Sequence, residues 1–254
     1  MATWLYALAA AAALHSGIVY HETTTWSGLL PHPARSCRVW SASASYRAEC
    51  TVEPGQAQAW AIAISRDADA TATLINPTNA TLYRRDENPP IPSSLYFGVS
   101  TPSRVAGKVE VESHAEPSAP LLNHPTHKQV IRIRYVLRTA AAPSVTLKVD
   151  IGATLLLTVA DDVAPPAKDQ RIRSGIAEVD AAIANAYRDV QGFVLRDELS
   201  VSRTYEGGQP RTERMLREVD QLSREPIAPS RFDVPPGLRH QTPVVGAPGG
   251  GPGA

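Results

Sequence analysis

The stretch that decides the fold runs from Gly192 to Gly237 and reads GFVLRDELSVSRTYEGGQPRTERMLREVDQLSREPIAPSRFDVPPG. From Phe193 to Tyr205, apolar residues occupy one parity and polar residues the other. Because successive strand residues point to opposite faces of a sheet, this pattern predicts a strand with one buried and one wetted face. Asp197 interrupts the apolar side. A Gly-Gly turn and a charged return strand complete a predicted hairpin.

A second alternating segment lies upstream, at 129–138 (QVIRIRYVLR). Its apolar parity predicts another amphipathic strand, whose inward side chains line the same side of the sheet as those of the first strand. Shorter β-branched and apolar segments recur between turns of Pro, Gly, Asn and Asp, which is the pattern of an antiparallel sheet. We expect strands at 17–25, 36–40, 46–52, 60–64, 71–75, 81–84, 108–112, 145–150 and 154–159, the last two separated by Gly152.

One segment has helical periodicity. Apolar residues from Ile176 to Val190 recur at helical spacing, so one face of a helix over 175–190 is apolar. Ser174 can cap the start of this helix, and Gly192 can end it. Together these elements predict a mainly β (α+β) fold: a curved antiparallel sheet, or half-barrel, with one amphipathic helix on its concave face.

The ends of the chain and one internal segment differ from the rest in composition. Trp4 to Leu14 is an apolar, Ala-rich run, so we predict a signal peptide at 1–16 and a periplasmic or secreted protein. Because no Lys or Arg precedes this run, a buried first helix or a misplaced start codon stays an alternative. No other run is long enough to cross a membrane. We predict one β-rich domain at 17–240, with a long Pro- and Ser-rich loop at 86–106, and a disordered tail at 241–254.

The charge balance and the cysteines narrow the functional classes. The formal net charge is +0, which argues against a nucleic-acid surface. Cys37 and Cys50 form no CxxC pair, and they flank a predicted hairpin whose turn centres on Ser43 and Ala44. This register places the two cysteines opposite each other, so we predict a disulfide in an oxidising compartment. A pair of buried free thiols is the alternative.

Histidines and paired carboxylates are the residues most able to carry chemistry. His124 and His127 form an H-x-x-H pattern without a third ligand, and Pro125 lies between them, so we interpret them as loop histidines and predict no metal site. Asp pairs occur at 67 and 69 and at 161 and 162. Both fall at predicted turns, which favours local hydrogen bonding over acid–base catalysis or calcium binding.

Sequence motifs of the common enzyme classes do not occur: the chain has no G-x-S-x-G elbow, P-loop or G-x-G-x-x-G. We therefore predict no catalytic residue and no cofactor, and we expect the protein not to be an enzyme. The arginines at 132, 134 and 138 form a basic stripe along one strand. We interpret this stripe as a solvated sheet face, with an anionic ligand as the alternative.

Short motifs along the chain resemble those of the DUF4412-like exported bacterial proteins of unknown function, which look related to the LolA fold of lipoprotein carriers. The segments that carry the resemblance are 17–23 (GIVYHET), 37–40 (CRVW), 45–49 (SYRAE), 75–77 (INP), 81–83 (TLY), 192–196 (GFVLR) and 232–237 (FDVPPG). Val194 stands where the family often has Pro, and Leu238 where it often has Tyr. The resemblance implies an antiparallel sheet that curves around a helix and has an apolar concave face, and it supplies no catalytic residues.

We therefore expect a non-enzymatic protein that holds an apolar or lipid-like ligand, or a protein partner of the cell envelope, in its concave sheet. The ligand-lining residues that we predict are Ile131, Ile133, Tyr135, Leu137, Phe193, Leu195 and Leu199. The first alternative is a structural or interaction module of the cell envelope, whose own side chains fill the core. The second is an enzyme, which a buried histidine with a carboxylate partner would favour.

Overall fold

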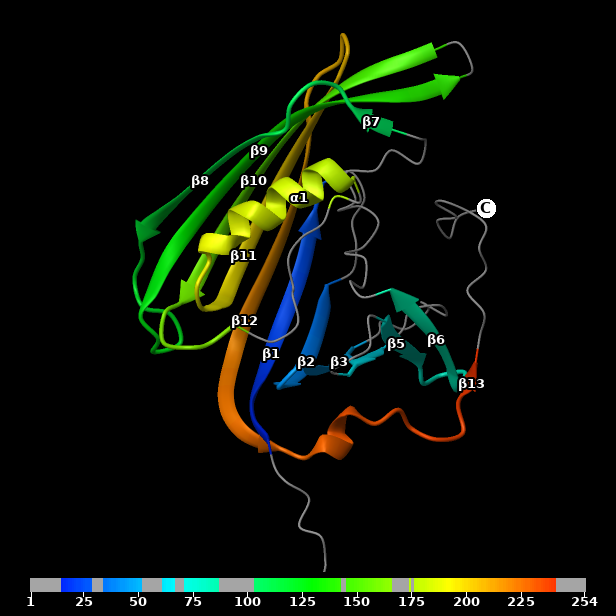
Figure 1. The fold of residues 1–254 in the computed structure, drawn as a ribbon, viewed down its shortest axis with the longest axis vertical. Coiled ribbons are helices and arrows are strands. Elements are labelled where there is room, and N and C mark those ends of the chain that lie inside the picture. The colour runs from blue at the N-terminus through cyan, green and yellow to red at the C-terminus, as the bar shows by residue number, and fades with distance from the viewer. Residues whose placement is uncertain are drawn as a thin grey trace, which may run out of the picture.

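A computed structural model describes residues 15–28, 34–51, 61–66, 71–86, 103–142, 145–165, 174 and 176–240. Within this part of the chain, one 13-stranded sheet forms the body of the protein (Figure 1). Its strands are β1 (His15–Ser27), β2 (Arg35–Ala42), β3 (Ser45–Cys50), β4 (Ile62–Ser65), β5 (Thr71–Asn76), β6 (Thr81–Asp86), β7 (Ser103–Val105), β8 (Glu110–Pro117), β9 (Thr126–Ala142), β10 (Val145–Ala160), β11 (Phe193–Tyr205), β12 (Arg211–Ile227) and β13 (Arg239–His240).

The strand order of the sheet is β13-β6-β5-β4-β3-β2-β1-β12-β11-β10-β9-β7, and β8 also pairs with β9. All of these pairings are antiparallel except the short one between β13 and β6. The sheet curves without closing, so the prediction of a mainly β, half-barrel fold with an amphipathic helix is confirmed.

Helix α1 (Ala177–Ala186) lies across the long strands on the concave side of the sheet, which we call the inner face (Figure 1). Val179, Ile183 and Ala186 form its buried stripe and pack into the cluster that β9, β10 and β11 build. Burial of a Val or Ile side chain is worth about 1.5–3 kcal/mol, so these contacts hold the helix in place. The helix continues into a 3-10 turn, η1 (Tyr187–Asp189).

The residues at the two ends of the helix differ from the predicted caps. Its N-cap is Ile176, which makes no side-chain cap hydrogen bond. Ser174 lies outside the helix, and its backbone N–H and hydroxyl donate to Asp180 Oδ1 over 2.5 and 2.8 Å. Gly192 follows η1 with a φ of +121°, and a Cβ there would lie 2.2 Å from the carbonyl oxygen of Ala160. A glycine is therefore required where the chain turns back into β11.

Three further predictions concern Gly152, the loop at 86–106 and the two ends of the chain. Gly152 does not separate two strands, because β10 continues through it and keeps its pairing with β9. Ser103–Val105, inside the predicted loop at 86–106, forms strand β7. The predicted signal peptide at 1–16 lies almost entirely outside the described residues, as do most of the predicted loop and the tail at 241–254.

The C-terminal segment from Ala228 to His240 covers the opposite side of the sheet, which we call the outer face. It begins with the 3-10 turn η2 (Pro229–Phe232), and Phe232 is buried there with Trp40 and Val19. The guanidinium of Arg231 lies 4.4 Å from the centre of the Trp40 ring. The segment ends in β13, which pairs with β6. One apolar layer therefore joins the end of the chain to the strands of its first half.

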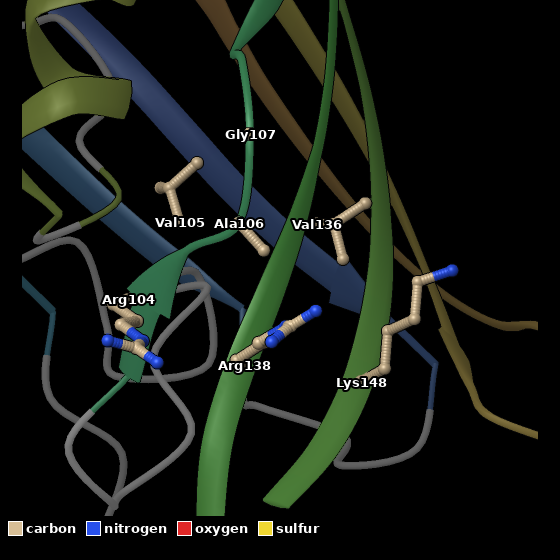
Figure 2. Close-up of a pocket in the computed structure, with 7 residues that line it drawn as sticks. All are labelled: Arg104, Val105, Ala106, Gly107, Val136, Arg138 and Lys148. Atoms are coloured by element: carbon tan, nitrogen blue, oxygen red, sulfur yellow. The ribbon is translucent and has the colours of Figure 1, made fainter.

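Strands β7 and β8 share the same edge of β9, and the chain passes between them at 106–109 (Figure 2). The N–H of Ala106 still donates to the carbonyl oxygen of Val136 over 2.8 Å. Gly107 follows with a φ of +93°, which lets the backbone leave the ladder. An open depression of about 530 Å³ lies beside this break.

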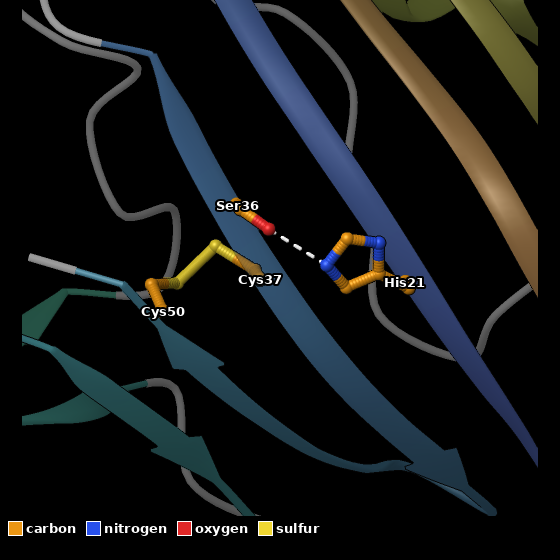
Figure 3. The surroundings of a disulfide bond; sticks show 4 residues. All are labelled: His21, Ser36, Cys37 and Cys50. Carbon is orange, nitrogen blue, oxygen red and sulfur yellow. Dashed lines mark hydrogen bonds between the residues drawn. A yellow bond between two sulfur atoms is a disulfide. The ribbon is translucent and has the colours of Figure 1, made fainter.

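The hairpin of β2 and β3 has the predicted register. Cys37 pairs with Cys50 and Val39 with Ala48, and the turn falls at Ser43 and Ala44. The two cysteines form a disulfide beside the His21 and Ser36 side chains (Figure 3). The predicted disulfide is thus confirmed, and the first hairpin of the sheet is closed covalently.

Replacement of both Cys37 and Cys50 by alanine should lower the free energy of unfolding by at most about 3 kcal/mol, because the bridge closes only a short loop of the unfolded chain. Urea denaturation of the variant and the wild type measures this difference, with the reduced wild type as the control. Titration of the denatured, unreduced wild type should find no free thiol, and two free thiols per chain would contradict the bridge.

Candidate functional site

The predicted ligand-lining residues lie on the inner face, and each is at most 4% exposed. Five of them share a cluster with the buried stripe of α1: Ile131, Ile133, Tyr135, Leu137 and Leu199. Phe193 and Leu195 belong to a second cluster with Tyr20, Val39 and Val219. The sheet therefore gathers all of them on one side, but in two adjoining clusters.

These side chains are packed against the protein's own residues. Two surface depressions, of about 390 and 530 Å³, lie beside the β11–β12 turn and beside β7. Neither is lined by a predicted ligand-lining residue. A ligand on this face would therefore need helix α1 to move away from the sheet.

Three charged residues lie where the two apolar clusters meet, and we call Glu22, Asp197 and Arg217 the inner ionic group. Asp197 of β11 pairs in register with Arg217 of β12, so both side chains project from the same face. A shift in register after His21 then pairs Glu22 of β1 with Val219 of β12. The inner face thus carries a polar position between Leu195 and Leu199.

The ion pair within this group is largely buried. Arg217 Nη2 lies 3.2 Å from Asp197 Oδ2, and the two side chains are 16% and 1% exposed. Burial raises the pKa of Asp197, and the charge of Arg217 opposes this rise. Burial likewise raises the pKa of Glu22 against the charges of Arg217 and Arg35. Burial lowers the pKa of Arg217, but the charges of Asp197 and Glu22 together outweigh it and raise this pKa, so the guanidinium stays charged.

One atom of this group lacks a partner in the part of the chain that the structure describes. Asp197 Oδ1 is buried and accepts no hydrogen bond. An unsatisfied buried polar atom costs about 1–3 kcal/mol, and more when it is charged. Such an atom is a ready acceptor for a hydroxyl, amide or ammonium donor that enters the inner face.

Sequence reasoning found only part of this group. Asp197 was visible because it interrupts an alternating apolar strand. Charged residues occupy both alternating sets of positions in the strand that contains Arg217. The sequence therefore did not show to which face of the sheet Arg217 projects. Glu22 shares the inward parity of Tyr20 in β1, but it was missed because the sequence does not reveal that β12, which carries Arg217, lies beside β1.

A second polar network lies on the outer face, where Asp220, His21 and Ser36 come from three adjacent strands. His21 Nδ1 lies 2.8 Å from Asp220 Oδ1, and Nε2 lies 2.6 Å from Ser36 Oγ (Figure 3). With the ring proton on Nδ1, His21 donates to the carboxylate and accepts from the hydroxyl. Asp220 is the extra residue at the register shift between β1 and β12, and such bulges re-aim side chains.

This order of groups is that of a Ser-His-Asp triad, which is recognised by geometry rather than by sequence position. The surroundings differ from those of an active site. Ser36 lies within strand β2, not at a turn that frees backbone N–H groups for an oxyanion, and neither surface depression is lined by these residues. The histidine is a third exposed, so the network links three strands near the surface.

The loop histidines and the acidic turn that the sequence analysis treated separately come together. His124 Nδ1 lies 2.9 Å from Asp162 Oδ1, and His127 Nδ1 lies 2.5 Å from Asp161 Oδ1. The hydrogen bond with His124 lowers the pKa of Asp162. His124 lies just before β9, whereas His127 is the second residue of β9, so the prediction of a loop histidine is wrong for His127. Both aspartates directly follow β10, so the two pairs join the start of β9 to the turn after β10. Among the described residues, no three His, Cys, Asp or Glu side chains are arranged to hold a metal ion.

Comparisons with known proteins identify no relative: no protein-family profile matches the chain, and no curated protein matches its sequence. Among the helices that the structure describes, none is both long and apolar enough to span a membrane. The resemblance to the DUF4412-like proteins therefore stays a prediction.

Replacement of Arg217 by methionine should lower the free energy of unfolding by about 3–5 kcal/mol at neutral pH, because it leaves buried carboxylates without their cation. The raised pKa values of Asp197 and Glu22 fix the sign of the pH dependence. Between the ordinary carboxyl pKa near 4 and these raised values, the folded protein binds more protons than the unfolded chain, so stability falls as pH rises.

The loss caused by Arg217→Met should therefore shrink as the pH is lowered from 7 towards about 4, where the buried carboxyls of the folded protein are protonated and no longer need a cation. Urea denaturation across this range measures it. Arg214→Met is the matched control, since Arg214 lies exposed on the same strand and its loss should cost less than about 0.5 kcal/mol. A pH-independent loss would argue against buried, ionised partners.

Proposed function

We propose that this is a non-enzymatic periplasmic or secreted protein that holds an apolar or lipid-like ligand between its inner face and helix α1. The ligand's chain would contact the apolar side chains on either side of the inner ionic group. Its polar end would carry a hydrogen-bond donor, which Asp197 Oδ1 would accept. The resemblance to the LolA fold of lipoprotein carriers agrees with such a ligand.

The observation that carries this proposal is the unpaired oxygen of Asp197. A core filled only by its own side chains gains nothing from a buried acceptor that nothing satisfies. The position also suits a ligand with one polar end, because apolar clusters lie on both sides of it. Helix α1 packs on the same inner face, is ten residues long and has no side-chain cap at its start.

A second candidate function is a structural or interaction module of the cell envelope with a self-filled core. The burial of all the predicted ligand-lining residues, each at most 4% exposed, favours it. Such a module would meet its partners with its surface. The two candidates differ in whether the inner face ever accepts a ligand.

Export is part of both candidates. Its support is the disulfide between Cys37 and Cys50, since such bonds persist in oxidising compartments and are rare in the cytosol.

Protein purified from its native compartment and extracted with organic solvent should release a lipid or another apolar molecule that mass spectrometry identifies. Asp197→Asn should reduce the retained amount or the affinity by at least about tenfold, because it replaces a charged acceptor by an amide. Glu198→Gln is the matched control: the next residue of the same strand projects to the outer face and pairs with Arg196. An extract without ligand, from a chain that also binds none when lipid is added, would favour the self-filled module.

The proposal that the protein is not an enzyme can be tested at Ser36, the serine of the outer-face network. A fluorophosphonate probe, which labels serines that a nearby base activates, should leave this residue unmodified because Ser36 lies within strand β2 and not at a turn that frees backbone N–H groups for an oxyanion. Mass spectrometry of the digested protein measures the labelling, with Ser36→Ala as the control. Labelling of the wild type that disappears in the variant would show a catalytic serine and contradict the proposal.

A further inference from the structure

Three cations form a row on the outer face, across strands β7, β9 and β10. Arg104 pairs in register with Arg138, and Arg138 pairs with Lys148. Directly opposed residues share a sheet face, with Cβ atoms about 4.5–5.5 Å apart. The three side chains therefore project side by side, with Arg138 between the other two (Figure 2). We call them the cationic row.

Acids of β8 lie opposite the neighbouring arginines of the same strand, whereas cations lie opposite Arg138 on both sides. Arg132 lies opposite Glu112, with its Nη1 4.0 Å from Glu112 Oε2, and Arg134 lies opposite Glu110. In the row, Lys148 Nζ lies 3.4 Å from Asp150 Oδ1. Within the described part of the chain, no ion pair joins Arg104 or Arg138 to a carboxylate.

This excess of positive charge is local and unfavourable in the free protein. The chain as a whole has a formal net charge of +0, so the row does not reflect a generally basic surface. Like charges directly opposite each other on a sheet are destabilising. A bound anion would neutralise these charges and remove their repulsion. Such binding explains why the protein keeps a destabilising arrangement.

The row also lines a concave site. The depression of about 530 Å³ at the break between β7 and β8 is bordered by all three cations and by the small or apolar residues Val105, Ala106, Gly107 and Val136. A Cβ on Gly107 would meet nothing within 4 Å, so the wall of the depression is open there. Two guanidinium groups and an ammonium at one depression suit a compact, multiply charged anion, because guanidinium binds phosphate oxygens in a fork.

We propose that Arg104, Arg138 and Lys148 form a binding site for a phosphate-type anion, carried either by a lipid head group or by a free phosphate compound. The site lies on the outer face and is separate from the inner ionic group. It does not depend on whether the inner face holds a ligand. The arginine stripe of the sequence thus divides into a part that lies opposite the acids of β8 and an anion site.

Two probes distinguish the two sources. Calorimetric titration with inorganic phosphate measures binding of the free anion. Co-sedimentation with vesicles of phosphatidylcholine, alone or mixed in equal parts with phosphatidylglycerol, measures binding of lipid head groups. We expect binding to at least one of phosphate and the mixed vesicles, and no binding to phosphatidylcholine alone. Phosphate binding alone would assign a free phosphate compound, and vesicle binding would assign a lipid surface.

The decisive variant is Arg104→Gln with Arg138→Gln, which should weaken binding about fivefold for each arginine removed. The matched control, Arg132→Gln with Arg134→Gln, removes the same charge from the same face of the sheet and should change binding less than twofold. Lys148→Gln is a second variant at the other end of the row, and thermal melts check that each variant folds. Equal weakening by the control, or absence of binding to both probes, would overturn the proposal.

Discussion

The sheet depends on strand β1, which pairs with β2 on one side and with β12 on the other. These two ladders join the strands of the first half of the chain to those of the second half. Strands β12 and β2 both lie close to Gly17 of β1. A Cβ on Gly17 would lie 2.5 Å from Ile227 Cδ1 and 2.7 Å from the carbonyl oxygen of Ser41. A larger residue at this position would require the backbone of β2 at Ser41 to shift.

The same junction places the polar groups of the protein. The register shift between β1 and β12 leaves Asp220 of β12 as an extra residue beside His21 on the outer face. Glu22 of β1 faces inward by regular alternation with Tyr20, and the shift sets Val219 opposite it. Asp220 shows the usual effect of a β-bulge, which re-aims side chains where a regular ladder would not.

Much of the fold followed from local patterns. The β2–β3 hairpin was predictable to the residue, because the turn and the parity of its strands fix the pairing of Cys37 with Cys50. The inward residues of β9 and β11 were predictable because each strand has one apolar parity. Gly152 misled the prediction because glycine usually weakens a strand, whereas here the long neighbours β9 and β11 hold the backbone extended on both sides.

The candidate sites were less predictable because they depend on which strands become neighbours. The arginines of β9 are visible in the sequence, but the position of two of them opposite acids of β8 is not. The sequence likewise contains Asp197 without revealing that Arg217 lies opposite. Charge partners across strands are set by the order of the sheet, and that order depends on contacts between residues far apart in the chain.

The position of β1 also has a consequence for folding. Its residue His21 contacts Asp220, 199 positions later in the chain, and the outer face is covered by the last described segment. Contacts of such high sequence separation slow folding, because the entropy of closing the loop is lost before the contact forms. One edge of the first strand stays unpaired until β12, near the end of the chain, has been synthesised. During that interval its free edge is exposed to other chains, which makes the newly made protein a natural client of chaperones that cover unpaired strands.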